Sequence, residues 1–208
     1  MRMTLTAFLI ALIFVVAPMF AGQYNEVLSI GDPAPVWSEL PGTDGKSHSF
    51  GEFKDDEALV IAFTCLSCPT AVDYEKRFDT LAKKYGAADG TAGRKAGFIA
   101  VCVNRVPEDR LDKLTERAKR QQLAFPIIYD ESQKIARDYG AIFTPEYYVL
   151  NKERKVTYMG AFDDATDSTK VSKHFVEDAL ISTLANESVA MKETLARGCR
   201  VRYLPLRN

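Results

Sequence analysis

Hydrophobic and polar positions follow two different periods along this chain. Residues 58–64 (ALVIAFT) and 98–103 (FIAVCV) are short and almost continuously apolar, a pattern that predicts strands buried on both faces of a sheet. Between them, apolar side chains recur every three or four positions from Ala71 to Tyr85, which is the period of one face of an amphipathic helix. Pro69 suits the first turn of this helix, because the N–H that proline lacks is left unpaired there.

The rest of the chain continues the alternation of helices and strands. The pattern predicts a helix that opens at Pro107. It then predicts a strand at 125–129, a short helix at 131–139 that is ended by Gly140, a hairpin of 146–150 and 155–159, and a last helix at 171–185. Strands that alternate with helices indicate a partly parallel sheet covered on both faces, and the hairpin makes that sheet mixed. The charged run 108–120 is expected to form the exposed face of the second helix.

The two ends of the chain differ from this middle part. Arg2 precedes an unbroken apolar run over residues 7–17, and Pro18 and the small residues Ala21 and Gly22 follow it. A positive start, a short apolar centre and a small-residue end are typical of a secretory signal, while a membrane span needs about 20 apolar residues. We therefore expect cleavage near Ala21 and export to the periplasm or the cell exterior, with an uncleaved anchor as the alternative.

Four segments follow from these patterns. The turn-rich stretch after the signal reads as irregular, with a short hairpin near residues 47–50, and the end of the chain shows no clear period. The predicted organisation is a signal peptide at 1–21, an irregular lead-in at 22–54, a folded domain at 55–185 and a C-terminal tail at 186–208.

Composition narrows the classes of function. The 208 residues include 27 basic and 28 acidic side chains, a formal net charge of -1, so no basic excess points to nucleic acid or to an anionic membrane surface. Apolar residues make up 47 % of the chain, enough for a core. Four cysteines are too few for a disulfide-stapled scaffold, but outside the cytoplasm disulfides persist.

Two of the cysteines carry the candidate chemistry. Cys65 and Cys68 lie where the first buried strand ends and the first amphipathic helix begins. The free N–H groups and partial positive charge of a helix N-terminus stabilise a thiolate. We predict that an exposed Cys65 attacks a substrate disulfide and that Cys68 resolves the mixed disulfide. A fixed structural disulfide or half of a zinc site is the alternative, although the sequence has no second C-x-x-C or H-x-x-x-H.

At this point a resemblance becomes clear. Residues 60–78 (VIAFTCLSCPTAVDYEKRF) resemble the active-site segment of the thioredoxin superfamily, and more narrowly of the bacterial redoxin (AhpC/TSA-type) proteins. Residues 143–164 (FTPEYYVLNKERKVTYMGAFDD) resemble the family segment with a cis-proline beside the reactive sulfur, here Pro145. A cis X-Pro bond makes a tight turn and would leave the backbone of Thr144 free to pair with an extended peptide. The tail segment 196–203 (ARGCRVRY) resembles the Gly-Cys ending of some redoxin-like proteins.

The resemblance covers about residues 30–185 and implies both fold and activity. It implies a three-layer α/β/α sandwich with a central mixed sheet. It also implies thiol–disulfide exchange with the thiols or disulfides of partner proteins, through Cys65, Cys68 and Pro145. An upstream redox partner would supply the redox equivalents, and no bound cofactor is required.

The chain departs from the family pattern at several positions, which keeps two other functions open. Thr64 stands in place of the usual tryptophan, and Leu59 in place of a buried acid. A thiol peroxidase would need P-x-x-x-T-x-x-C, which puts a proline at Ile61 and a threonine at Cys65. A non-enzymatic copper-binding or redox-sensing module would add His174 as a distal ligand, but copper-delivering relatives separate their cysteines by three residues rather than two.

The remaining cysteines have different expectations. Cys102 lies inside the second buried strand and is expected to act as a small hydrophobic residue. Cys199 has basic neighbours, which favour a thiolate; it is a resolving cysteine for the pair, a partner of Cys102, an intermolecular link or a free thiol, because sequence does not fix connectivity. The acids Asp163 and Asp164 are expected in a solvated turn.

Overall fold

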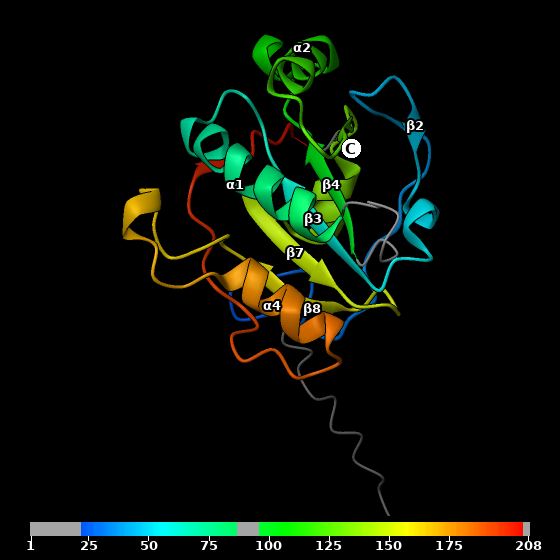
Figure 1. Cartoon of the computed structure of the whole chain (residues 1–208). Helices are drawn as coiled ribbons and strands as arrows, with labels where there is room; N and C mark the ends of the chain where they lie inside the picture. Colours follow the sequence, from blue (N-terminus) through cyan, green and yellow to red (C-terminus); the bar gives the residue numbers. More distant parts are fainter. Residues whose placement is uncertain (1–21, 87–95, 206–208) are drawn as a thin grey trace, which may run out of the picture.

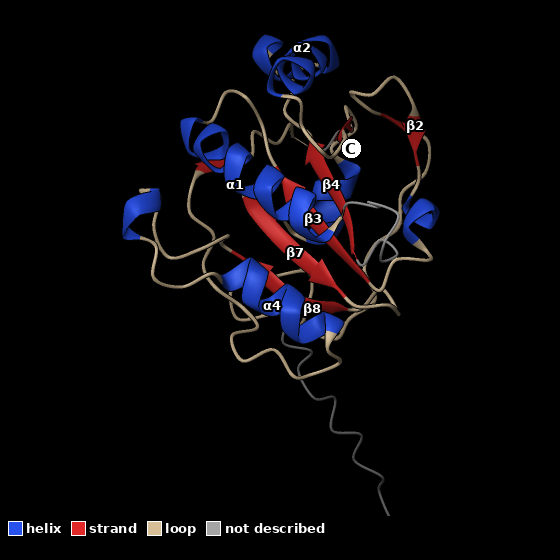
Figure 2. Ribbon diagram, in the orientation of Figure 1, coloured by secondary structure: helices blue, strands red, loops and turns tan. Residues whose placement is uncertain are grey.

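A five-stranded mixed sheet forms the centre of the molecule. The structure is a computed structural model that describes residues 22–86 and 96–205, so the predicted signal peptide lies outside the described residues. Figures 1 and 2 show the sheet between layers of helices. Its strands run in the order β5–β4–β3–β7–β8, with bounds β3 Ala58–Phe63, β4 Ala96–Cys102, β5 Ile127–Tyr129, β7 Glu146–Leu150 and β8 Val156–Gly160.

The pairing of the strands follows from the order of the elements. β3, β4 and β5 run parallel, with Val60 opposite Phe98, because each connection between them contains a helix. β7 pairs antiparallel with both β3 and β8, which is the predicted hairpin. The four α-helices in the described ranges are α1 Pro69–Tyr85, α2 Leu111–Gln121, α3 Lys134–Tyr139 and α4 Phe175–Leu184. None of the helices in residues 22–86 and 96–205 is long and apolar enough to cross a membrane.

Two hydrophobic clusters cover the two faces of the sheet. On one face Val60 and Tyr147 pack with Phe78 of α1 and Leu180 of α4, and Figure 1 shows both helices lying across this face. On the other face the neighbouring positions, such as Ile61, pack with α3 and with the lead-in. Strand residues alternate between the two clusters because successive side chains point to opposite faces. The predicted three-layer α/β/α sandwich with a mixed sheet is confirmed.

The lead-in is part of this second cluster. Its Trp37, Phe50 and Phe53 are buried against Leu59 and Ile61 of β3. It contains the short strands β1 (Leu40–Pro41) and β2 (Ser47–His48), which form a two-stranded sheet of their own. The turn residues that make this segment look irregular therefore position a hydrophobic cap over the sheet.

Three helices begin later than the sequence predicts, and one of them is α3, which starts at Lys134 rather than at residue 131. Pro107 opens a 3-10 turn (Pro107–Asp109), and α2 starts only at Leu111, because Arg110 has an extended backbone. Likewise α4 starts at Phe175, after a separate 3-10 turn (Ser168–Lys170). All three differences lie at helix ends, where periodicity gives the least information.

Candidate active site at the C-x-x-C pair

The two cysteines of the C-x-x-C pair lie between the end of β3 and the start of α1. Cys68 is the N-cap residue of α1, with extended backbone, and its Sγ accepts the N–H of Ala71 at 3.4 Å. Cys65 lies outside the helix. The prediction that the helix N-terminus acts on Cys65 is therefore wrong, because the helix begins one full turn later and offers its N–H to Cys68.

Both sulfurs are buried, which also corrects the expectation of an exposed Cys65. Cys65 is 1 % exposed and Cys68 is 0 % exposed, and each is a free thiol. Thr144 contacts both: its hydroxyl lies 3.3 Å from Cys65 Sγ, and its carbonyl oxygen lies 3.0 Å from Cys68 Sγ. The physical reason for the burial is that this threonine, together with the chain that pairs with it, lies over the pair.

The contacts of the pair place its negative charge on Cys68. A hydrogen bond from the Cys65 thiol is the largest effect that lowers the pKa of Cys68, to about 4; burial opposes it, and Cys199 and the N–H of Ala71 add to it. The hydrogen bond to Cys68 and burial raise the pKa of Cys65, and the carboxylate of Asp109 raises it further. The carbonyl of Thr144 favours a protonated Cys68, but the donors around that sulfur outweigh it. Cys68, rather than Cys65, is thus the more acidic thiol.

The strand before Pro145 forms one wall of the site. The Thr144–Pro145 peptide bond is cis, as expected. Residues Phe143–Thr144 form the short strand β6, and this strand is paired with the chain's own tail, β9 (Cys199–Arg200). Thr144 lies opposite Cys199 and donates its hydroxyl to the carbonyl oxygen of Cys199 at 3.4 Å. The backbone edge predicted to be free for a substrate peptide is therefore occupied.

The tail brings a third cysteine to the pair. Cys199 is exposed and lies opposite Thr144 in the β6–β9 pairing. Interaction with the Cys68 side chain is the first cause that raises the pKa of Cys199 to about 11; burial and the charge of Cys68 add to this. Cys102 is fully buried in β4, and its thiol lies 3.5 Å from the carbonyl oxygen of Asp109. Of the roles left open for Cys199, a role beside the pair fits the structure, and Cys102 has the predicted hydrophobic surroundings.

Asp109 holds the residues between the two cysteines, and sequence reasoning missed it. Its carboxylate accepts the N–H groups of Leu66 at 2.7 Å and Ser67 at 2.8 Å, and the Ser67 hydroxyl at 2.6 Å. The side chain is fully buried, so the expectation that the run 108–120 forms one exposed face is wrong at this position. The 3-10 turn that delays α2 turns Asp109 inward. No sequence signal marks it among its charged neighbours.

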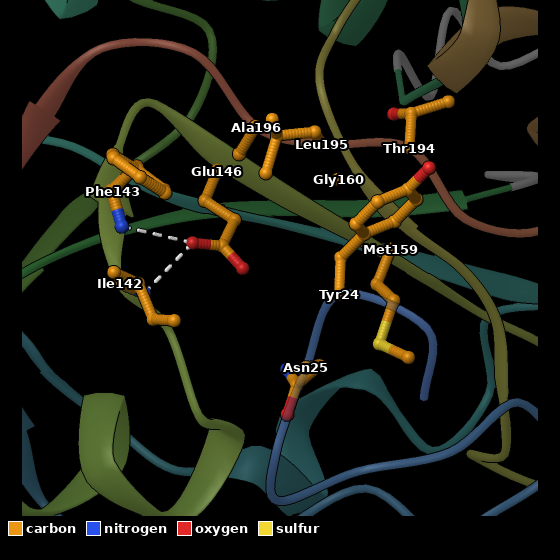
Figure 3. Close-up of a pocket in the computed structure, with 10 residues that line it drawn as sticks. All are labelled: Tyr24, Asn25, Ile142, Phe143, Glu146, Met159, Gly160, Thr194, Leu195 and Ala196. Atoms are coloured by element: carbon orange, nitrogen blue, oxygen red, sulfur yellow. Dashed lines mark hydrogen bonds between the residues drawn. The ribbon is translucent and has the colours of Figure 1, made fainter. Parts of the chain in front are cut away.

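Glu146 fixes the backbone that leads to Pro145. Figure 3 shows its carboxylate in a small pocket, where one oxygen accepts the N–H groups of Ile142 at 2.9 Å and Phe143 at 3.0 Å. The hydroxyl of Tyr148 donates to the other oxygen at 3.0 Å. Burial raises the pKa of Glu146 above its ordinary value, and the three hydrogen bonds partly offset this. Glu146 thereby holds β6 in place beside the sulfurs.

Two further predictions concern residues away from the pair. His174 lies at the N-cap of α4 and lines a pocket with Arg77 and Leu81. Among the residues that the structure describes, no three His, Cys, Asp or Glu side chains are grouped so as to hold a metal ion. Asp163 is 3 % exposed and pairs with Arg77 at 2.6 Å; the predicted solvated turn is wrong there, because the acid neutralises a largely buried arginine.

The fold and the position of the cysteines define a protein of the thioredoxin-fold class. Residues 29–175 match the Redoxin family, and the chain belongs to that family. No curated protein matches the chain.

Solved structures show the same fold. A hypothetical protein of Sinorhizobium meliloti is 27 % identical, with a TM-score of 0.77 over 86 % of this chain and 97 % of its own. An uncharacterized conserved protein of Geobacillus kaustophilus is also 27 % identical, with a TM-score of 0.77 over 86 % of this chain and 94 % of its own. A thiol:disulfide interchange protein of Chlorobium tepidum is 18 % identical, with a TM-score of 0.57 over 75 % and 98 % of the chains; at this identity it supports the fold alone.

Proposed function

We propose that this Redoxin-family protein is a thiol–disulfide oxidoreductase whose redox centre is the Cys65–Cys68 pair. The observation that carries the proposal is the position of Cys68 at the N-cap of α1, where its Sγ accepts the N–H of Ala71 at 3.4 Å, while Thr144 contacts the sulfurs of both Cys65 and Cys68. A thiolate is the nucleophile and the better leaving group in disulfide exchange. Two neighbouring sulfurs that share one proton can therefore be oxidised to a disulfide and reduced again.

The surroundings of the pair support a reversible reaction. Asp109 fixes the backbone of Leu66 and Ser67, so the turn that carries both sulfurs is held by three hydrogen bonds to one buried carboxylate. The Ser67 hydroxyl also lies 3.7 Å from Cys65 Sγ. These contacts hold the backbone of the turn on which the disulfide would form.

Substrates and location belong to the same proposal. Its substrates are thiols or disulfides of partner proteins, and an upstream redox partner restores the pair. The apolar run near the N-terminus supports export. Outside the cytoplasm disulfides persist, so partner proteins there can carry the disulfides that this exchange uses.

A redox titration combined with cysteine variants tests the proposal. We expect the protein without residues 1–21 to form one disulfide between Cys65 and Cys68 in a glutathione redox buffer, and to reduce a protein disulfide catalytically with dithiothreitol as donor. Cys65→Ser and Cys68→Ser should each lose turnover by at least about tenfold, because the disulfide can no longer form. Peptide mass mapping and a turnover assay measure the two effects.

Cys102→Ala is the matched control for these variants. It also removes a buried thiol, but from β4, where no role in exchange is proposed. Turnover that survives in both Cys65→Ser and Cys68→Ser would contradict the proposal, as would a titration that gives no Cys65–Cys68 disulfide.

A further inference from the structure

The C-terminal tail is seated against the pair by specific contacts. Beyond the β6–β9 pairing, the N–H of Val201 bonds the carbonyl of Ile142 at 2.8 Å. The N–H of Arg202 bonds the Asn104 side chain at 3.1 Å, and the hydroxyl of Tyr203 bonds the Ala141 carbonyl at 2.6 Å. Figure 1 shows the short red strand beside the N-terminal end of α1. An extended segment that pairs with Thr144 has the position expected of a substrate peptide.

Gly198 makes the close approach of this segment possible. A Cβ at this position would overlap the carbonyl oxygen of Thr144, so any larger residue would push the tail away from β6. The next residue is Cys199. The tail thus combines a glycine that allows close contact with β6 and a cysteine that pairs with Thr144, the residue in contact with both sulfurs of the pair.

Exposure separates the three thiols. Cys65 and Cys68 are buried, whereas Cys199 is exposed and pairs with Thr144, whose carbonyl oxygen lies 3.0 Å from Cys68 Sγ. An external disulfide therefore meets Cys199 first. We propose that Cys199 is a third reacting thiol, which exchanges disulfides with external substrates and passes them to the buried pair through a Cys68–Cys199 disulfide. This inference rests on the redox function proposed for the pair.

Each step of this relay balances. The Cys199 thiolate attacks an external disulfide and forms a mixed disulfide, while the other external sulfur leaves and takes up the proton of Cys199. The Cys68 thiolate then attacks Cys199 Sγ, and the second external thiolate leaves. Finally Cys65 loses its proton to solvent and attacks Cys68 Sγ, and the Cys199 thiolate leaves. The external disulfide gains two electrons and the pair loses two; the reverse sequence oxidises an external dithiol.

The acidity of Cys68 supports this route in the direction that oxidises an external dithiol. A thiol of low pKa is a good leaving group, so an external thiolate that attacks the exposed Cys199 of a Cys68–Cys199 disulfide displaces Cys68 readily. The charge and hydrogen bond of Cys68 also hold the pKa of Cys199 high. Once Cys68 is part of a disulfide, its sulfur carries no charge and no longer raises the pKa of Cys199.

Disulfide mapping in a Cys65→Ser variant tests the relay directly. After treatment with oxidised glutathione, we expect an internal Cys68–Cys199 disulfide and no retained glutathione. Adding Gly198→Ala should lower the yield of that disulfide severalfold, whereas Gly51→Ala is the control, because a Cβ there meets no neighbouring atom. A persistent glutathione adduct, or no reaction, in Cys65→Ser would overturn the proposal.

A rate measurement separates this proposal from the function of the pair. Cys199→Ser keeps the tail but removes the exposed thiol, so we expect the Cys65–Cys68 disulfide to form with oxidised glutathione at least about tenfold more slowly. An unchanged or faster rate would overturn the relay and leave the pair as the redox centre. If the wild-type protein formed no Cys65–Cys68 disulfide, the function of the pair would fail, while the mapping in Cys65→Ser would still decide whether Cys199 reacts with Cys68.

Discussion

At the scale of single residues, the acidity of Cys68 is the property with the most direct measurement. Its pKa is lowered to about 4, first by the hydrogen bond from Cys65. We expect the ultraviolet absorbance of the reduced protein to show one thiolate that titrates near pH 4. The signal should disappear in Cys68→Ser and move to higher pH in Cys65→Ala, because alanine has no group that can donate this hydrogen bond.

Cys102→Ala serves as control for this titration as well. Burial, followed by the carboxylate of Asp109, raises the pKa of Cys102, so its removal should leave the low-pH step unchanged. A thiolate signal near pH 4 that persists in Cys68→Ser would assign the charge to Cys65 and restore the order of attack that the sequence suggests.

Glu146 predicts a pH dependence of stability with a definite sign. Its pKa in the folded protein is raised above the reference value of 4.5, because burial disfavours the carboxylate. The folded state thus binds the proton more tightly than the unfolded state, so this contribution is full below pH 4.5 and is lost as the pH rises through the folded-state pKa. We expect the free energy of unfolding of Glu146→Gln, minus that of the wild type, to increase as the pH rises above about 4.5.

Urea denaturation across this pH range measures the difference. Gln keeps an oxygen for the N–H groups of Ile142 and Phe143 and has no charge, so comparison with the wild type isolates the titration of Glu146. Glu26→Gln, at an exposed position, is the control for a general effect of losing one carboxylate. A difference that is flat with pH, or that decreases, would contradict the prediction.

At the scale of elements, a buried ion pair joins α1 to the turn after β8. Asp163 accepts from Arg77 at 2.6 Å and from the Tyr74 hydroxyl at 2.8 Å. Removing one partner of a buried pair leaves the other charge without compensation and typically costs about 3 kcal/mol. We expect Asp163→Ala to lower the free energy of unfolding by about that amount in denaturant titrations.

Lys84→Ala is the matched control on the same helix. Lys84 pairs with Glu177 of α4 at 2.7 Å, but its side chain is exposed, so solvent already compensates the charge and the loss should be much smaller. Equal losses for the two variants would mean that the buried position of Asp163 has no special effect.

The elements also differ in how well the sequence predicts them. The range of β3 follows closely from its apolar run, because a strand buried on both faces needs apolar residues at every position. β9 has two residues and no period, and its partner lies 55 positions away at Thr144. Sequence patterns contain information on local periods. They therefore predict the position of the cysteine pair but not β9, whose pairing with β6 covers it.

The same limit explains the buried acids. Asp109 lies between the charged residues Glu108 and Arg110, and Asp163 lies beside a second acid. Only the tertiary fold brings the backbone of Leu66 and the side chain of Arg77 to them. Their burial depends on partners distant in the chain, whereas the helix face of Phe78 is visible within a few turns.

At the scale of the whole molecule, the lead-in contributes to the core. Trp37 is 8 % exposed and packs edge-to-face on Phe50, with ring centroids 4.8 Å apart. Replacing a buried aromatic residue by alanine typically costs about 3–5 kcal/mol. We expect a loss in this range for Trp37→Ala, measured by urea denaturation followed by circular dichroism, because Trp37 is the single tryptophan and its fluorescence is lost.

The neighbouring Val36 provides the control. It is 72 % exposed, so Val36→Ala changes the same segment without opening a cavity and should have little effect on stability. If Trp37→Ala were as stable as Val36→Ala, the lead-in would be a detachable arm rather than part of the folded body.

The antiparallel contact between β6 and β9 has a consequence for the chemical environment of the protein. A group tethered to its target acts at a millimolar effective concentration when the linkage permits contact. Free small thiols in dilute surroundings compete poorly with such a neighbour, so they react with the buried sulfurs more slowly than Cys199 does. Molecules that bind the C-terminal tail then control the oxidation and reduction of the Cys65–Cys68 pair.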